Sequence, residues 1–283
     1  MESNIRIHEE YAHLKEAQRA ALERLSTLLC TYDDQILQQK PYWAAKYAEA
    51  FGVLEQQCYA VFVRSSELRR RIALVRAYMN HGAEPDAEAI DEQIAQEFKE
   101  YEEMLRQMEE ERVRAAQILG AKEMSDEDTK HFKHLYRQLA KKLHPDLHPE
   151  QTAEMKKLWQ RAMDAYALGD LARLEILAAI VESKCADNVD IAAGDGKNVI
   201  ASVLEELRTA LAETEERIRK CLTALERLEQ EHPFKHRALL ENPRAIDERK
   251  TELKHQIAHY MAACKELEIK LAMMMQGRAE VLH

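Results

Sequence analysis

Apolar residues three or four positions apart recur along nearly the whole chain, which is the spacing of one face of a helix. The most regular stretch begins at Lys130 and carries lysine and arginine between its apolar positions. Its apolar stripe consists of Phe132, Leu135, Tyr136, Leu139 and Leu143. The pattern predicts an amphipathic helix with a basic outer face.

The tripeptide His144-Pro145-Asp146 ends this predicted helix. Pro145 has no N–H and restricts the residue before it to extended backbone angles, so the helix stops there. A second pair, His148-Pro149, suits the start of another helix. The apolar face of that helix is formed by Met155, Leu158, Trp159, Ala162, Met163, Ala165 and Tyr166. We therefore expect two helices joined by an exposed loop that displays His144 and Asp146.

Residues 1–111 form an N-terminal helical segment in this interpretation. The helical patterns cover about residues 1–30, 41–80 and 86–119, and Asp33-Asp34 and Pro41 are expected to break the first from the second. The third pattern has a narrow apolar stripe among many charges, which is typical of a coiled-coil-like helix. It leads directly into the region of the basic helix.

Residues 198–283 carry two apolar seams with steps of three and four, separated by a break that contains Pro233 and Pro243. Two seams of similar length across a short connection favour an antiparallel coiled-coil hairpin. Its core would be thin, so it should pack on the N-terminal helices, on a second copy of the chain in a homo-oligomer, or on a client protein. Residues 185–197, rich in glycine and aspartate, are expected to be a linker.

The composition supports an all-α fold. The chain of 283 residues holds only 7 glycines and 6 prolines, and 33% of its residues are charged. The net charge of −10 disfavours binding to nucleic acid or anionic membranes. The five cysteines have no metal-ligand spacing, so we expect reduced thiols, no metal site and a cytoplasmic location. The chain has no apolar run long enough to cross a bilayer and no signal-peptide pattern at its start.

Several of these residues together resemble the J domain, the DnaJ-type co-chaperone module. The matching residues are Tyr136-Arg137-Gln138-Leu139-Ala140 in the basic helix, His144-Pro145-Asp146, Ala165-Tyr166, and Ile118-Leu119-Gly120 upstream. The resemblance covers about residues 112–170 and implies a J domain with an extended last helix over 112–184. Neither a Gly/Phe-rich region nor a zinc-binding domain accompanies it.

The resemblance implies a binding function. In the J-domain family the His-Pro-Asp loop contacts the ATPase domain of a DnaK-type chaperone and stimulates ATP hydrolysis there. It implies partner-binding roles for His144, Pro145 and Asp146, and for Lys133, Arg137 and Lys141 on the basic face. The chemistry belongs to the partner, so the chain is expected to be no enzyme, with no catalytic residue and no cofactor. Flanking helices would select an unknown client or a location.

Each of these features also has a purely structural explanation. The lysines and arginine can be a solvated helix face, His144 a loop residue fixed by proline, and Asp146 a turn former. The alternative function is therefore a structural or scaffold coiled-coil protein whose J-like domain is non-functional or occluded. A His-Pro-Asp loop packed against its own flanking helices would favour that alternative. A nucleic-acid-binding role fits neither the net charge nor the lack of interleaved exposed aromatics.

Overall fold

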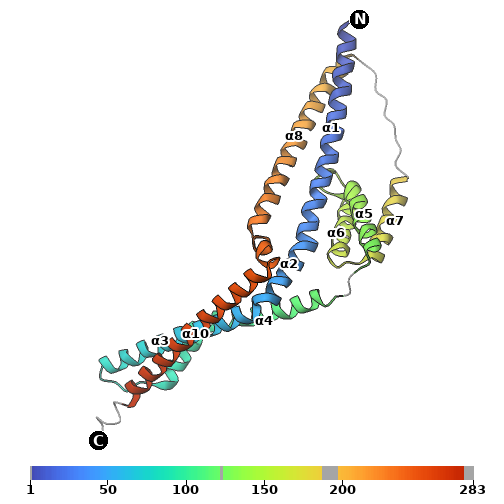
Figure 1. Cartoon of the computed structure of the whole chain (residues 1–283). Coiled ribbons are helices and arrows are strands. Elements are labelled where there is room, and N and C mark those ends of the chain that lie inside the picture. Colours follow the sequence, from blue (N-terminus) through green and yellow to red (C-terminus); the bar gives the residue numbers. More distant parts are fainter. Residues whose placement is uncertain (1, 122–123, 187–196, 277–283) are drawn as a thin grey trace. The chain divides into compact units, whose positions relative to one another are not determined.

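The computed structural model describes residues 2–121, 124–186 and 197–276, and these residues form helices without any strand (Figure 1). The all-α prediction is confirmed for this part of the chain. No helix within it is both long and apolar enough to span a bilayer. The chain divides into two compact units, Met1–Pro41 with Lys122–Lys235, and Tyr42–Ala121 with His236–His283.

A pair of long helices runs through the first unit: α1 (Glu2–Asp34) and α8 (Lys197–Gln230) lie side by side. Arg208 on α8 pairs with Glu10 on α1, and further along Gln18 donates a hydrogen bond of 3.1 Å to Thr214. The residue numbers of the paired positions increase in the same direction along α1 and α8, so the two helices are parallel. The buried seam between them contains Leu25, Leu29, Ile218 and Cys221.

Three shorter helices complete the first unit: α5 (Asp126–Leu143), α6 (Ala153–Ala167) and α7 (Leu171–Ala186). Each begins or ends where a local interaction satisfies the backbone. The predicted N-cap Ser125 accepts a hydrogen bond from Asp128 N–H, and Thr152 caps α6 in the same way. At Gly169, with φ of +68°, the Asp170 N–H bonds Ala165 O and closes α6.

The core of the first unit lies among α5, α6 and α7, with the end of α1 and the π-helical turn η1 (Gln35–Gln39) packed against it. The aromatic residues of the sequence pattern meet inside this core. The Tyr136 and Tyr166 rings stack with centroids 3.9 Å apart, and Phe132 stacks on Tyr166 at 4.7 Å. The contacts of Tyr136 and Phe132 with Tyr166 make α5 and α6 an antiparallel pair.

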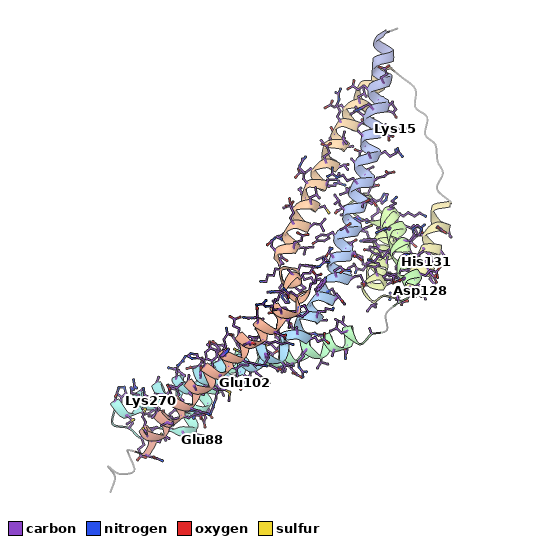
Figure 2. The ribbon with its side chains drawn as sticks, viewed as in Figure 1. Lys15, Glu88, Glu102, Asp128, His131 and Lys270 are labelled. Carbon is purple, nitrogen blue, oxygen red and sulfur yellow. The ribbon has the colours of Figure 1, made fainter. Side chains whose placement is uncertain are left out.

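The second unit is built around α3 (Val53–Asn80), with α4 (Ala87–Leu119) and α10 (Pro243–Gln276) beside it (Figure 1). Its shorter elements are α2 (Lys40–Tyr47), which crosses the unit boundary, η2 (Ala48–Gly52) and α9 (Arg237–Leu240), while η3 (Phe234–His236) lies at the other boundary. A cluster of aliphatic residues and Phe98 forms its core between α3 and α4. Charged side chains such as Glu88, Glu102 and Lys270 line its outer faces (Figure 2).

Two expectations about the long helices are wrong. The predicted break at Asp33-Asp34 and Pro41 does not occur, because two π-helical turns keep the chain helical from α1 into α3. The π-helical turn η1 ends two residues before Pro41, and the Lys40 N–H bonds the Gln35 carbonyl. The predicted hairpin over 198–283 does not form either, since α8 pairs with α1 and α10 pairs with α3.

The compact units also divide the chain at positions other than the expected domain boundaries near 111 and 184. In particular, α4, which ends at the Ile118-Leu119-Gly120 match, belongs to the second unit, whereas the basic helix α5 belongs to the first. Ile118 is 43% exposed. In the first unit, α1, η1 and α7 pack on the α5–α6 pair. Most of the expected linker 185–197 lies outside the described residues.

Candidate functional site

The His-Pro-Asp loop is a tight turn that follows α5. His144 has the extended backbone that a following proline requires, with φ of −67° and ψ of 129°. Its carbonyl accepts hydrogen bonds from the N–H groups of Leu147 and His148, both at 3.0 Å. The His148 ring donates from Nε2 to the Lys141 carbonyl at 2.7 Å. These bonds fix the shape of the loop from within.

The His144 side chain takes part in this internal bonding, so the expectation of an exposed His144 is wrong. The residue is only 9% exposed, and its ring meets the Trp159 ring edge-to-face at 4.9 Å. Burial lowers the pKa of His144, which favours the neutral ring at pH 7. The ring Nδ1 accepts the Asp146 N–H at 3.0 Å, so the proton of the neutral ring is on Nε2.

Asp146 has an exposed side chain, as expected, but its backbone is held by α8. The Arg217 guanidinium donates a hydrogen bond of 2.7 Å to the Asp146 carbonyl. The next residue, Leu147, is partly buried against the apolar seam between α1 and α8. The loop therefore contacts both of the long helices of its own unit.

The three basic candidates on α5 differ in their surroundings. Arg137 and Lys141 are exposed and lie one helical turn apart. Lys133 is half-buried, and its ammonium group lies 3.3 Å from the carboxylate of Asp34 at the end of α1. The outer face of α5 is thus partly occupied by acidic residues of the same chain.

Two adjacent aspartates of α1 bond the two stacked tyrosines of the core. The Tyr136 hydroxyl donates to Asp33 at 2.8 Å, and the Tyr166 hydroxyl donates to Asp34 at 2.7 Å. Burial raises the pKa of Asp33 to about 6, the Tyr136 hydrogen bond opposes this shift, and the Asp146 charge adds to it. Asp33 is thus a buried carboxyl group that faces a second carboxylate.

The contact between α1 and α5 is not completely filled. A cavity of about 80 Å³ lies between them, lined by both apolar and charged groups. Its walls include Cys30, Thr31, Asp34, Lys133, Tyr136, Arg137 and Tyr166. Within the described residues, no group of three or more histidine, cysteine or acidic side chains is arranged to hold a metal ion.

Comparison of the chain with protein-family models, curated proteins and solved structures found no match. The assignment of a role to the site therefore depends on the residues themselves.

The structure brings together most of the residues singled out from the sequence. His144, Pro145 and Asp146 follow α5 directly, and Arg137 and Lys141 lie on its exposed side. Sequence reasoning missed Asp33, Asp34 and Arg217. These residues contact the loop or the basic helix in space but are far from it along the chain. The Asp33-Asp34 pair was noticed only as a helix break. Its acidic charge, complementary to the basic helix, was the available signal.

Proposed function

We propose that this chain is a J-domain-type co-chaperone that binds a DnaK-type chaperone through His144-Pro145-Asp146 and stimulates its ATP hydrolysis. The basic residues Lys133, Arg137 and Lys141 would contact the acidic surface of that chaperone. The other helices would provide specificity for a client or a location. The chain would supply no catalytic group, because the reaction takes place in the partner.

One observation carries this proposal: His144-Pro145-Asp146 lies at the turn of an antiparallel helix pair whose first helix is basic. The Asp146 side chain, Arg137 and Lys141 are all exposed to solvent. Exposed charges of this kind accelerate the encounter with an oppositely charged partner more than they strengthen the final complex. A rigid loop beside them would supply the specific part of the contact.

The rival proposal is a scaffold protein with an occluded J-like region. The observation in its favour is the contact of α8 with the loop, where Arg217 bonds the Asp146 carbonyl and Leu147 is partly buried. The parallel α1–α8 pair, with its buried apolar seam, also has the character of a structural element. The two proposals differ in whether a DnaK-type chaperone responds to the chain.

Single-turnover ATP hydrolysis by a DnaK-type chaperone tests the proposal. We expect stimulation by the chain, loss of stimulation in Asp146→Asn, and retention in Asp164→Asn, which removes one exposed carboxylate from α6 instead. Stimulation should weaken as salt rises, because exposed charges are screened. His144→Gln is a weaker test, because His144 is buried and shapes the loop.

Equal stimulation by the wild type and Asp146→Asn would exclude a role for the loop. The absence of stimulation and of binding by every variant would favour the scaffold proposal. Circular dichroism of each variant excludes loss of structure as the cause.

A further inference from the structure

The last turns of α1 place a carboxylate where an acidic partner would meet the basic helix. The Asp34 carboxylate lies 3.3 Å from Lys133 Nζ and accepts the Tyr166 hydroxyl hydrogen bond. Arg137 lines the same small cavity. Because the Asp34 carboxylate already neutralises part of the Lys133 charge and lies on this side of α5, it would repel and compete with an external acid there.

Helix α8 contacts the His-Pro-Asp loop itself. Arg217 on α8 donates to the Asp146 carbonyl, and Leu147 packs against apolar residues of α1 and α8. The buried thiols Cys30 on α1 and Cys221 on α8 lie beside this contact, each 8% exposed. The two helices together therefore cover one side of the loop and one edge of the basic helix.

Several features oppose this closed arrangement. Asp33 is buried at the contact, where taking a charge out of water is costly, and the nearby Asp146 carboxylate repels it. The cavity of about 80 Å³ shows that α1 and α5 do not fill the space between them. The Lys133–Asp34 pair is partly exposed, and such pairs contribute little stability. The contact of α1 with α5 is therefore weakly stabilised, and an acidic partner that binds Lys133 would shift it toward the open state.

We propose that α1 and α8 form a releasable intrachain cover over the His-Pro-Asp loop and the adjoining basic face of α5, and that its release is required for full binding of a DnaK-type chaperone. This inference rests on the proposed function. It identifies Asp34 and Arg217 as the residues that hold the cover closed. It identifies Asp33 as a residue that weakens the closed state.

Thiol labelling of the full chain measures opening without any chaperone. In the closed state burial raises the pKa of Cys30 to about 11, and burial also raises that of Cys221, so both thiols should react slowly. Cys264 is buried in the second unit and serves as an internal reference. Peptide mass spectrometry after timed alkylation gives a separate rate for each cysteine.

The test variant is Asp34→Asn combined with Arg217→Ala. The asparagine keeps an acceptor for Tyr166 but removes the charge that holds Lys133. The matched control is Glu16→Gln with Arg219→Ala, which removes the same charges from exposed positions of α1 and α8. We expect the test variant to increase labelling of Cys30 and Cys221, and chaperone stimulation at limiting concentration, by about 3- to 10-fold.

The control should match the wild type in both assays, and Cys264 should not change. Asp33→Asn should act in the opposite direction, slowing Cys30 and Cys221 labelling and reducing stimulation.

The outcomes separate the two proposals. Faster labelling without increased stimulation, in a chain that does stimulate the chaperone, would overturn the cover and leave the co-chaperone function intact. Unchanged labelling in the test variant would also overturn the cover. Faster labelling with no stimulation by any variant would instead overturn the proposed function, together with the inference that depends on it.

Discussion

The core of the first unit contains an aromatic stack whose hydroxyl groups bond carboxylates, whereas the buried cluster between α3 and α4 in the second unit consists of four aliphatic residues and Phe98. Tyr136 and Tyr166 stack on each other, and both donate hydrogen bonds to carboxylates of α1. Between α3 and α4, the buried residues are Val63, Val75, Ile90, Ile94 and Phe98, and charged pairs lie only at the surface.

The difference concerns specificity rather than the amount of apolar surface. A shifted register of α1 would leave the buried Asp33 without its Tyr136 partner, and an unpaired buried acid is costly. An aliphatic seam tolerates rearrangement more easily, because one methyl group can replace another. The Asp33–Tyr136 bond therefore restricts the register of α1 on α5 more than an aliphatic contact would.

The largest effects should come from cavities in the two cores. Leu139→Ala in the first unit and Leu68→Ala in the second each remove a side chain that is no more than 2% exposed. Each should lower the free energy of unfolding by about 2–5 kcal/mol. The chain has two tryptophans, Trp159 in the first unit and Trp43 in the second, so single-tryptophan variants report each urea transition separately.

If the two units are energetically independent, each substitution shifts only the transition of its own unit. Equal shifts of both transitions by either substitution would mean that the units unfold as one. The stabilities of the two cores could then not be compared separately.

The next prediction concerns the pH dependence of stability that the buried Asp33 gives to the first unit. Asp33 has a folded-state pKa of about 6, against an ordinary value of 3.8. A pKa raised by folding means that the folded state binds the proton more tightly, so stability falls as pH rises between these values. Asp33→Asn should therefore change stability little at pH 4 and add about 2–3 kcal/mol at pH 7.

Urea unfolding monitored by Trp159 fluorescence at the two pH values measures this difference. The titratable groups that surround Asp33 are Tyr136 on α5, Asp146 in the loop, Cys30 on α1 and Cys221 on α8. Asp164→Asn, at an exposed carboxylate, is the control. An Asp33→Asn effect of equal size at pH 4 and pH 7 would show that the carboxyl group is not the cause.

A third comparison uses one glycine from each unit. Gly169 has φ of +68°, a conformation that costs other residues about 1–2 kcal/mol, and an added Cβ would lie 3.2 Å from Met124 Cε. Gly52 is helical, and an added Cβ would meet only Ala48 Cβ at 3.8 Å. Gly169→Ala should therefore destabilise the first unit by about 1–2 kcal/mol, whereas Gly52→Ala should stabilise the second by about 0.5–1 kcal/mol.

Thermal unfolding, followed by the fluorescence of the tryptophan in each unit, shows whether Gly169→Ala lowers and Gly52→Ala raises the unfolding temperature. Destabilisation by Gly52→Ala would mean that the π-helical turn η2 depends on glycine for a reason other than space.

Local features of the fold were predictable from the sequence, but the partners of the long helices were not. The limits of α5 follow from Ser125, a capping residue, and from Pro145, which cannot continue a helix. The apolar stripes of α8 and α10 also occur as predicted. A stripe specifies which face is buried but not what buries it, so the hairpin prediction failed while the helix prediction succeeded.

The site shows the same limit. His144-Pro145-Asp146 was recognised from neighbouring residues. The bonds of Arg217 to the loop, of Asp33 to Tyr136 and of Asp34 to Tyr166 instead join positions about 70 or more residues apart. The burial of His144 also depends on Trp159, a residue of the facing helix. Such contacts are set by tertiary packing and leave no periodic signal in the sequence.

The smallest effect should come from the surface pairs of the second unit. Arg70 on α3 donates two hydrogen bonds to Glu97 on α4, but the two side chains are 39% and 35% exposed, so water competes for them. Glu97→Gln should leave the unfolding midpoint of the second unit, followed by Trp43 fluorescence, within experimental error at moderate salt. The reason is that the aliphatic core, and not this pair, holds α4 on α3. A large loss of stability that disappears in high salt would show that these charges, and not the apolar residues, hold α4 on α3.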